Sequence, residues 1–236
     1  MRQPVPPDPR TRDDLLDAMR LGACPLCVLV ERIERRAVVM FLYEEVNDIG
    51  RRDALRASRG LCLHHTEMLA EGRSALGIAI VSRDILRAMT AELEAVATSD
   101  GGWLRMLEGP GPRAATRIEP QAGCPMCAER PRIEAPLILG LLQNLGDEAF
   151  AAAYDASGGL CRVHLAATLR AADAATARSL AARQAMVWRR LEALLDEFIR
   201  KQDYRYQREP LTGPERDVWR RALQLTSGWY APRRDD

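Results

Sequence analysis

The sequence predicts an all-α protein built as a tandem-duplicated helical bundle. Three observations carry this prediction: apolar residues recur at helical spacing, strand-like alternation is absent, and one arrangement of cysteine, proline, glycine and histidine occurs twice. Aromatic residues make up only 5% of the chain, whereas strands are usually enriched in them. The periodicity therefore indicates helices, and the doubled arrangement indicates the duplication.

The expected helices follow one another along both halves of the chain. Acidic residues precede an arginine in residues 13–20, which suits a helix dipole. A second stretch begins at Pro25, a residue tolerated in the first helical turn, and continues to Phe41 with apolar residues three or four apart. Further helices are expected from residue 60 onward, over 78–96, over 133–145 and over 187–199, and a short capped one over 213–223.

The doubled motif has two halves in each copy. The first half is Cys-Pro-x-Cys, at residues 24–27 and 124–127, and the second is Gly-Leu-Cys-x-x-His, at residues 60–65 and 159–164. The first halves are 100 positions apart and the second halves 99, so one residue has been gained or lost between them. All six cysteines and two of the three histidines fall inside these motifs. Two matching sets of three cysteines and one histidine indicate two tetrahedral metal sites.

Each half of the motif has a physical reason to bind metal. Cys-Pro-x-Cys at a helix start directs two sulfurs to one place, where free backbone N–H groups and the helix dipole favour thiolate. Gly60 and Gly159 permit a positive φ or a close backbone approach. One Cys3His metal site is therefore expected to staple each repeat, and a metal shared between halves of different repeats, which requires domain swapping, is the alternative. The expected ligands are Cys24, Cys27, Cys62 and His65 in the first repeat and Cys124, Cys127, Cys161 and His164 in the second.

The ligand type favours two Zn²⁺ ions, one for each set. A closed set of four protein ligands leaves no position for a substrate, so the metal is expected to be structural. An iron–sulfur cluster, or thiol redox chemistry without a metal, could use the same residues. A thioredoxin-type motif needs a βαβ context that the sequence lacks. A c-type haem needs a histidine where Val28 and Ala128 stand.

These motifs divide the chain into five expected segments. Two helical metal-binding repeats are separated by glycine and proline residues typical of a linker, in which Trp103 to Leu107 are expected to form a short helical turn. The expected segments are a flexible proline-rich arm (1–12), repeat 1 (13–98), the linker (99–116), repeat 2 (117–203) and an arginine- and aromatic-rich tail with a short helix (204–236).

His64 stands apart from the repeated design, because Val163 occupies the matching position of the second copy. A surface imidazole, or one beside the metal ligands, is the simplest interpretation. Exchange with His65 as a ligand and a role in proton transfer are the alternatives.

Composition limits the classes of partner and compartment. The chain has 236 residues, of which 47% are hydrophobic and 28% charged, and its net charge is +1. Such a balance gives no general attraction to nucleic acid or to an anionic membrane. No run of about 18 apolar residues occurs, and the N-terminus lacks the apolar segment of a secretory signal. Cysteines without such a signal suggest a reducing compartment, so a cytoplasmic protein with no membrane association is expected.

The tail offers candidate partner-binding residues, which alternate arginine with aromatic side chains. Such side chains can stack on bases or clamp phosphate, so nucleic-acid binding is a weaker alternative function. Packing of the aromatic residues back onto the bundle is the other interpretation. The partner is expected to be a macromolecule of unspecified kind, and a homodimer is left open. The candidates are Arg200, Lys201, Tyr204, Arg205, Arg208, Trp219 and Arg220.

The sequence contains no pattern typical of a catalytic site. A nucleophile triad signature, a P-loop and a dinucleotide fingerprint are all missing. The sequence therefore favours a non-enzymatic zinc-binding protein that serves as an interaction or regulatory module, with catalysis left open.

The doubled motif and the tail together resemble a bacterial family whose members carry a domain of unknown function. The resemblance rests on the two copies of Gly-x-Cys-Pro-x-Cys followed by Gly-Leu-Cys-x-x-His, on the segment Phe198-Ile199-Arg200-Lys201-Gln202-Asp203-Tyr204-Arg205, and on a Trp-Arg-Arg helix. It covers about residues 15–228. The resemblance implies a helical cytosolic protein rich in cysteine and histidine, with the eight ligands named above.

Overall fold

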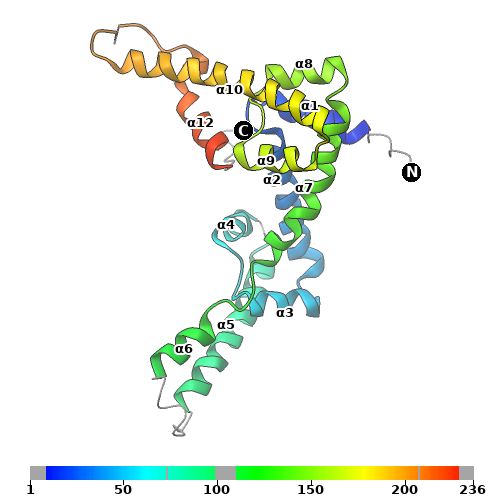
Figure 1. Cartoon of the computed structure of the whole chain (residues 1–236). Helices are drawn as coiled ribbons and strands as arrows, with labels where there is room; N and C mark the ends of the chain where they lie inside the picture. Colours follow the sequence, from blue (N-terminus) through cyan, green and yellow to red (C-terminus); the bar gives the residue numbers. More distant parts are fainter. Residues whose placement is uncertain (1–8, 73, 99–109, 207, 229–236) are drawn as a thin grey trace. The chain divides into compact units, whose positions relative to one another are not determined.

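The computed structural model describes residues 9–72, 74–98, 110–206 and 208–228, and all regular structure in these ranges is helical (Figure 1). No strand occurs among them, which confirms the all-α prediction. No helix in these ranges has both the length and the apolar character needed to cross a membrane. The helices are α1 (Pro9–Met19), α2 (Pro25–Met40), the π-helical turn η1 (Phe41–Glu45), α3 (Ile49–Ala57), α4 (Leu63–Glu71), α5 (Ala75–Ala97), α6 (Pro110–Ile118), α7 (Pro125–Asn144), α8 (Glu148–Ala156), α9 (Arg162–Ala171), α10 (Ala174–Gln202), α11 (Gly213–Arg216) and α12 (Val218–Ser227).

The chain forms two compact units that differ from the two expected repeats. Unit 1 comprises residues 1–32 and 132–236, and unit 2 comprises residues 33–131. Both boundaries fall inside helices, in α2 and in α7. Each unit therefore combines segments from both copies of the motif.

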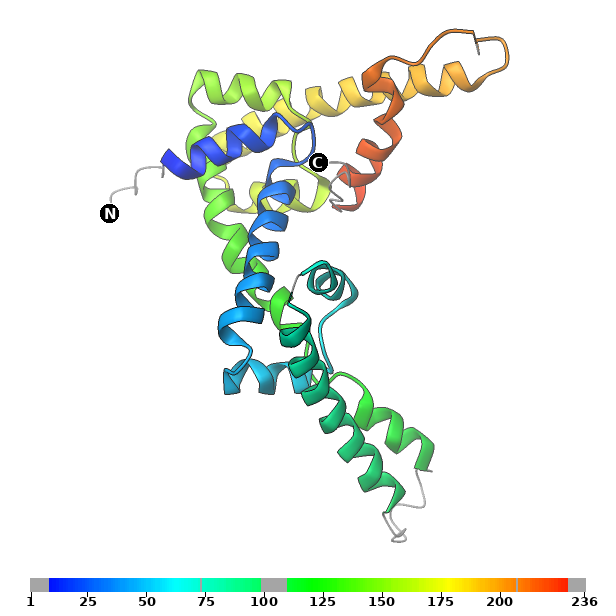
Figure 2. The same cartoon turned by 180° about the vertical axis from the view of Figure 1, so that it is seen from behind.

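Unit 1 packs helices from the two ends of the chain together. Helix α1 lies against α8, and its Arg12 forms an ion pair of 3.1 Å with Asp147. Leu15 of α1 and Phe150 and Tyr154 of α8 are completely buried. Helix α12 turns back to contact both α10 and α9 (Figure 2). The tail is thus an integral part of this unit, but the buried residues of α12 are Val218 and Leu225. The aromatic residues Tyr204 and Trp219 stay exposed, so the packing interpretation is wrong for these two side chains.

Unit 2 has its own smaller core. The buried residues of this core come from η1, α3, α5 and the start of α7, and they include Phe41, Leu55, Val81 and Met126. Beyond this core, α5 runs beside α6 as a hairpin (Figure 1). The apolar stripe of α5 is consequently buried only near its start, and Leu93 towards its end is 43% exposed.

The two halves of the chain place helices in the same order, with the same residue types before two pairs of helices. Asp48 accepts a hydrogen bond from a backbone N–H at the start of α3, and Asp147, 99 positions later, does so at the start of α8. Cys62 and Cys161 are the residues that precede α4 and α9. Side-chain capping of exposed N–H groups fixes where a helix begins.

The extra residue of the first half lies between Pro25 and Asp48, the stretch that holds the π-helical turn η1. From Pro25 to Asp48 there are 23 positions, and from Pro125 to Asp147 there are 22. In the second half, α7 continues as an α-helix to Asn144 without such a turn. A π-helical turn accommodates one additional residue within a helix. The change in offset from 100 to 99 thus falls in the stretch that holds this turn.

Several expected boundaries are corrected by the structure. Helix α1 begins at Pro9, inside the expected arm, and α6 occupies residues 110–118, inside the expected linker. Proline at both helix starts explains this, because its fixed φ suits the first turn. Helix α3 was not expected, and the expected helix over 213–223 is divided into α11 and α12 at Asp217. The remainder of the arm (1–8), the expected turn at Trp103 to Leu107 and the end of the tail (229–236) lie outside the described residues.

Candidate metal centres

The eight expected ligands form two clusters, but the clusters do not follow the repeats. Cys24, Cys27, Cys161 and His164 form site A, and Cys62, His65, Cys124 and Cys127 form site B. The prediction that each repeat binds its own metal is therefore wrong, and the alternative grouping between repeats is the one found.

The length of the helix after the first Cys-Pro-x-Cys explains why the clusters combine motif halves from different repeats. Helix α2 has 16 residues and η1 adds 5, which carries the chain about 30 Å from Cys27. The nine residues of α3 span only about 14 Å. The cysteine and histidine at the start of α4 therefore meet the other Cys-Pro-x-Cys rather than their own.

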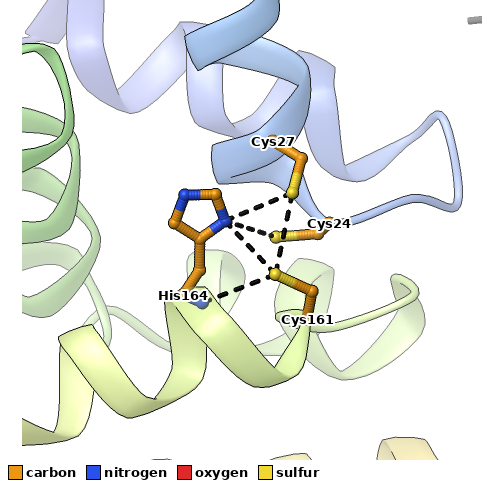
Figure 3. Close-up of side chains that lie close together, drawn as sticks. All are labelled: Cys24, Cys27, Cys161 and His164. Atoms are coloured by element: carbon orange, nitrogen blue, oxygen red, sulfur yellow. Dashed lines mark hydrogen bonds between the residues drawn. The ribbon is translucent and has the colours of Figure 1, made fainter. Parts of the chain in front are cut away.

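Site A brings two helix starts together within unit 1 (Figure 3). Cys24 and Cys27 come from the start of α2, and Cys161 and His164 from the start of α9. The Nδ1 atom of His164 lies 3.5 Å from Cys24 Sγ, 3.2 Å from Cys27 Sγ and 3.3 Å from Cys161 Sγ. The Sγ atoms of Cys27 and Cys161 are 3.6 Å apart.

Site B repeats this geometry within unit 2. Cys124 and Cys127 come from the start of α7, and Cys62 and His65 from the start of α4. The Nδ1 atom of His65 lies 3.2 Å from Cys62 Sγ, 3.7 Å from Cys124 Sγ and 3.5 Å from Cys127 Sγ. The Sγ atoms of Cys62 and Cys127 are 3.6 Å apart.

These distances fit a tetrahedral zinc ion. Bond lengths of about 2.3 Å to sulfur and 2.1 Å to nitrogen, at tetrahedral angles, place ligand atoms about 3.8 Å apart for two sulfurs and about 3.6 Å apart for nitrogen and sulfur. The separations in both sites lie close to these values, and all four ligand atoms of each set lie within 4.8 Å of one another. Both sets of side chains could therefore hold a metal ion.

The glycine before each Cys-x-x-His supplies the backbone turn that the site needs. Gly60 has φ +112° and Gly159 has φ +69°, so the positive φ that the sequence permits occurs at both positions. A Cβ atom on Gly159 would lie 2.6 Å from Nε2 of Gln184, whereas one on Gly60 would meet only Ile85, at 4.0 Å. Gly159 is therefore required both for its conformation and for the space it leaves.

We expect Gly159→Ala to destabilise the protein more than Gly60→Ala. Positive φ costs an alanine about 1–3 kcal/mol at either position, and at residue 159 the methyl group also displaces the buried Gln184. Urea unfolding of both variants measures the two costs. Equal costs would contradict the close packing around Gly159.

The two sites differ in their access to solvent. All four ligands of site A are buried, and Cys161 is completely inaccessible. The tail covers this site: the carbonyl oxygen of Gly228 lies 3.9 Å from Cys27 Sγ, and the Arg162 side chain donates to the Thr226 carbonyl at 3.0 Å. In site B only His65 is buried, and Cys127 is exposed.

The histidine of each cluster has a glutamate on its far side, which the sequence did not reveal. The Nε2 atom of His65 lies 3.5 Å from Oε1 of Glu34, and that of His164 lies 3.5 Å from Oε1 of Glu134. The two glutamates stand 100 positions apart, the same offset as the Cys-Pro-x-Cys motifs. That offset was the signal that could have identified them.

His64 contributes to the surroundings of site B rather than to its ligand set. Its Nε2 atom lies 3.6 Å from Oε2 of Glu34, and its ring meets that of His65 edge-on. Arg130 donates to both oxygens of the same glutamate, at 2.9 and 2.8 Å. The structure thus places His64 beside the four side chains of site B, the position that the simplest interpretation predicts.

Protonation in site B is strongly shaped by its neighbours before a metal binds. Burial opposes ionisation of Cys62, but contacts with His65 lower the pKa of this thiol to about 7, while burial raises the pKa of Cys127 to about 12. The Glu34 carboxylate raises the pKa of His65 to about 9. A metal must displace these protons, so the affinity of the site falls as the pH falls.

The candidate partner-binding residues of the tail are mostly engaged with one another and with nearby acids. Arg200 pairs with Glu197 and Glu209, Lys201 with Glu215, and Arg205 with Asp203. Arg220 lies over the ring of Trp219. Tyr204 is 80% exposed and Trp219 47% exposed, and Arg208 is exposed as well.

Comparison with known proteins places the chain in a family without assigning an activity. No curated protein matches the chain, and no solved structure does. One family model matches residues 14–233, which is nearly the whole chain and includes both sites. The chain belongs to this family of unknown function (DUF6062).

Proposed function

We propose that this protein is a non-enzymatic zinc-binding protein in which sites A and B each hold one structural Zn²⁺. The observation that carries the proposal is the convergence of four ligand atoms of matching type and spacing in each unit. Each set joins two helix starts that are far apart in the sequence, so an ion in it would hold its unit together.

The closed ligand sets favour a structural role over a catalytic one. Three thiolates and one imidazole complete a tetrahedron, which leaves no position for a substrate or an activated water. The full burial of site A reinforces this argument, because a substrate has no access to its sulfurs. Binding of zinc to such a site contributes directly to folding free energy.

The same proposal includes a tandem duplication. It is supported by the common order of helices, by the paired caps and by the location of the extra residue in the stretch that holds the π-helical turn. In the duplicated molecule, each Cys-Pro-x-Cys serves the site whose Cys-x-x-His comes from the other copy.

We also propose that the tail acts as the contact surface for a macromolecular partner. Exposed aromatic side chains next to arginine, at Tyr204 and at Trp219 with Arg220, support this role. Nucleic acid is disfavoured as the partner, because three of the candidate cations already pair with acids. Binding of nucleic acid to the tail with an affinity that falls steeply as the salt concentration rises would instead favour nucleic acid as the partner.

Elemental analysis of anaerobically purified protein tests the zinc proposal. We expect two zinc ions per chain and a colourless solution. A brown solution that absorbs near 400 nm and contains iron would contradict the proposal in favour of an iron–sulfur protein. Metal-free protein that keeps full helicity and stability would contradict any structural role for a metal.

The exposure of Cys127 predicts that site B loses its metal first. A chelator, or an oxidant such as hydrogen peroxide, reaches an exposed sulfur but not the sulfurs of site A, which are covered by the tail. We expect zinc release in two phases of equal amplitude, with rates at least about tenfold apart. A zinc-responsive dye measures these rates, and Cys127→Ser should remove the fast phase only. A single phase would contradict the difference between the sites.

A further inference from the structure

We propose that Glu134 and Glu34 are positioning residues that orient the metal-binding histidines of sites A and B. The inference rests on the proposed metal binding. In both sites the Nδ1 atom faces the three sulfurs, so a bound metal takes this nitrogen and leaves the proton on Nε2.

The Nε2 atoms need an acceptor, and the glutamates are placed to supply one. Both Nε2 atoms are buried and make no hydrogen bond within the described part of the chain. A buried N–H group without an acceptor costs about 1–3 kcal/mol. A glutamate oxygen lies 3.5 Å from each of them, within reach of a small side-chain adjustment when the metal fixes the ring.

The placement of the two glutamates in the fold is the same. Each stands seven residues after the second cysteine of a Cys-Pro-x-Cys, Glu34 on α2 and Glu134 on α7. Each faces the histidine of its own copy, whereas the cysteines of its helix serve the other site. One helix thus supplies two ligands to one site and the orienting carboxylate to the other.

The two carboxylates differ in how they are held. The Glu34 side chain is only 3% exposed, and it contacts Arg130 and His64 as well as His65. The Glu134 side chain is 22% exposed. The residue that corresponds to Arg130, 100 positions earlier in the first copy, is the uncharged Val30. Glu134 therefore gives the cleaner test, because, among the described residues, its replacement removes no ion pair with an arginine comparable to that between Glu34 and Arg130.

The test combines zinc affinity with nitrogen NMR of the imidazoles. The chain has three histidines, so each ring signal can be assigned. We expect Glu134→Gln to weaken zinc binding at site A about tenfold and Glu134→Ala up to about 100-fold. The Nε2–H signal of His164 should shift in both variants, while that of His65 stays in place. Glu129→Gln, which removes a partly exposed charge from the same helix, should change neither quantity.

Glu34 is tested together with Arg130, because Glu34→Gln alone could fail to fold. The variant Glu34→Gln with Arg130→Gln should shift the signals of His65 and His64 and weaken site B, but leave site A unchanged. Unchanged signals together with affinities within twofold of wild type would overturn the positioning role. If nitrogen NMR of the wild-type protein showed no zinc on the Nδ1 atoms of His65 and His164, that result would instead refute the metal binding on which the inference rests.

Discussion

Cys161→Ser should remove the metal from site A and destabilise unit 1 by at least about 4 kcal/mol. Structural zinc contributes about 10–16 kcal/mol of apparent binding free energy in zinc-finger peptides. Unit 1 has an apolar core of its own, so we expect its stability to depend on the metal less than that of a zinc finger. Serine keeps the other role of Cys161, which is to cap α9 by accepting from the His164 backbone N–H. The substitution therefore isolates the contribution of the metal.

Chemical unfolding with and without chelator measures this effect. In zinc-saturated buffer the variant should unfold at much lower denaturant concentration than wild type. In excess chelator the two proteins should agree within about 0.5 kcal/mol, because neither holds a metal. A difference that is the same in both buffers would contradict a structural metal at Cys161.

Gln184→Leu should cost about 4 kcal/mol although it touches no metal ligand. The Gln184 side chain is 1% exposed, and its Oε1 atom accepts hydrogen bonds from the Tyr154 hydroxyl and from the Leu160 N–H. Burial raises the pKa of Tyr154, so its hydroxyl stays protonated and donates. Loss of the acceptor leaves two buried donors unpaired, at about 1–3 kcal/mol each. Leu160 directly precedes Cys161, so zinc affinity at site A should fall as well.

A double-mutant cycle separates this network from general packing. Tyr154→Phe removes one of the two stranded donors, so the double variant should cost less than the sum of the single ones. Gln202→Leu, at the exposed end of the same helix, should have an effect within about 0.5 kcal/mol of zero. Additive costs, or a cost below 1 kcal/mol for Gln184→Leu, would contradict the role of Gln184 in holding the turn before Cys161.

The sequence was sufficient to predict the all-α class and the eight cysteine and histidine residues that cluster in the structure, because both depend on local patterns. A helical period needs only neighbours along the chain, and cysteine and histidine at these spacings suit few other roles. The positive φ of Gly60 and Gly159 followed from the same local argument.

The grouping of the ligands could not be predicted, because it depends on the directions of helices far apart in the sequence. The separation of the motif halves, 34 or 35 residues, is compatible with either grouping. What decides between them is the length of α2 with η1, and the sequence did not reveal where α3 would begin. Glu34 was missed because an isolated glutamate on a helix is usually a solvated side chain.

The metal content of paired ligand variants tests the crossed grouping most directly. Cys24→Ser with Cys161→Ser removes two ligands from site A, so this variant should retain one zinc ion per chain after desalting. Cys24→Ser with Cys62→Ser removes one ligand from each site, so it should retain none. If the first variant lost both ions and the second kept one, each repeat would bind its own metal and the crossed grouping would be wrong.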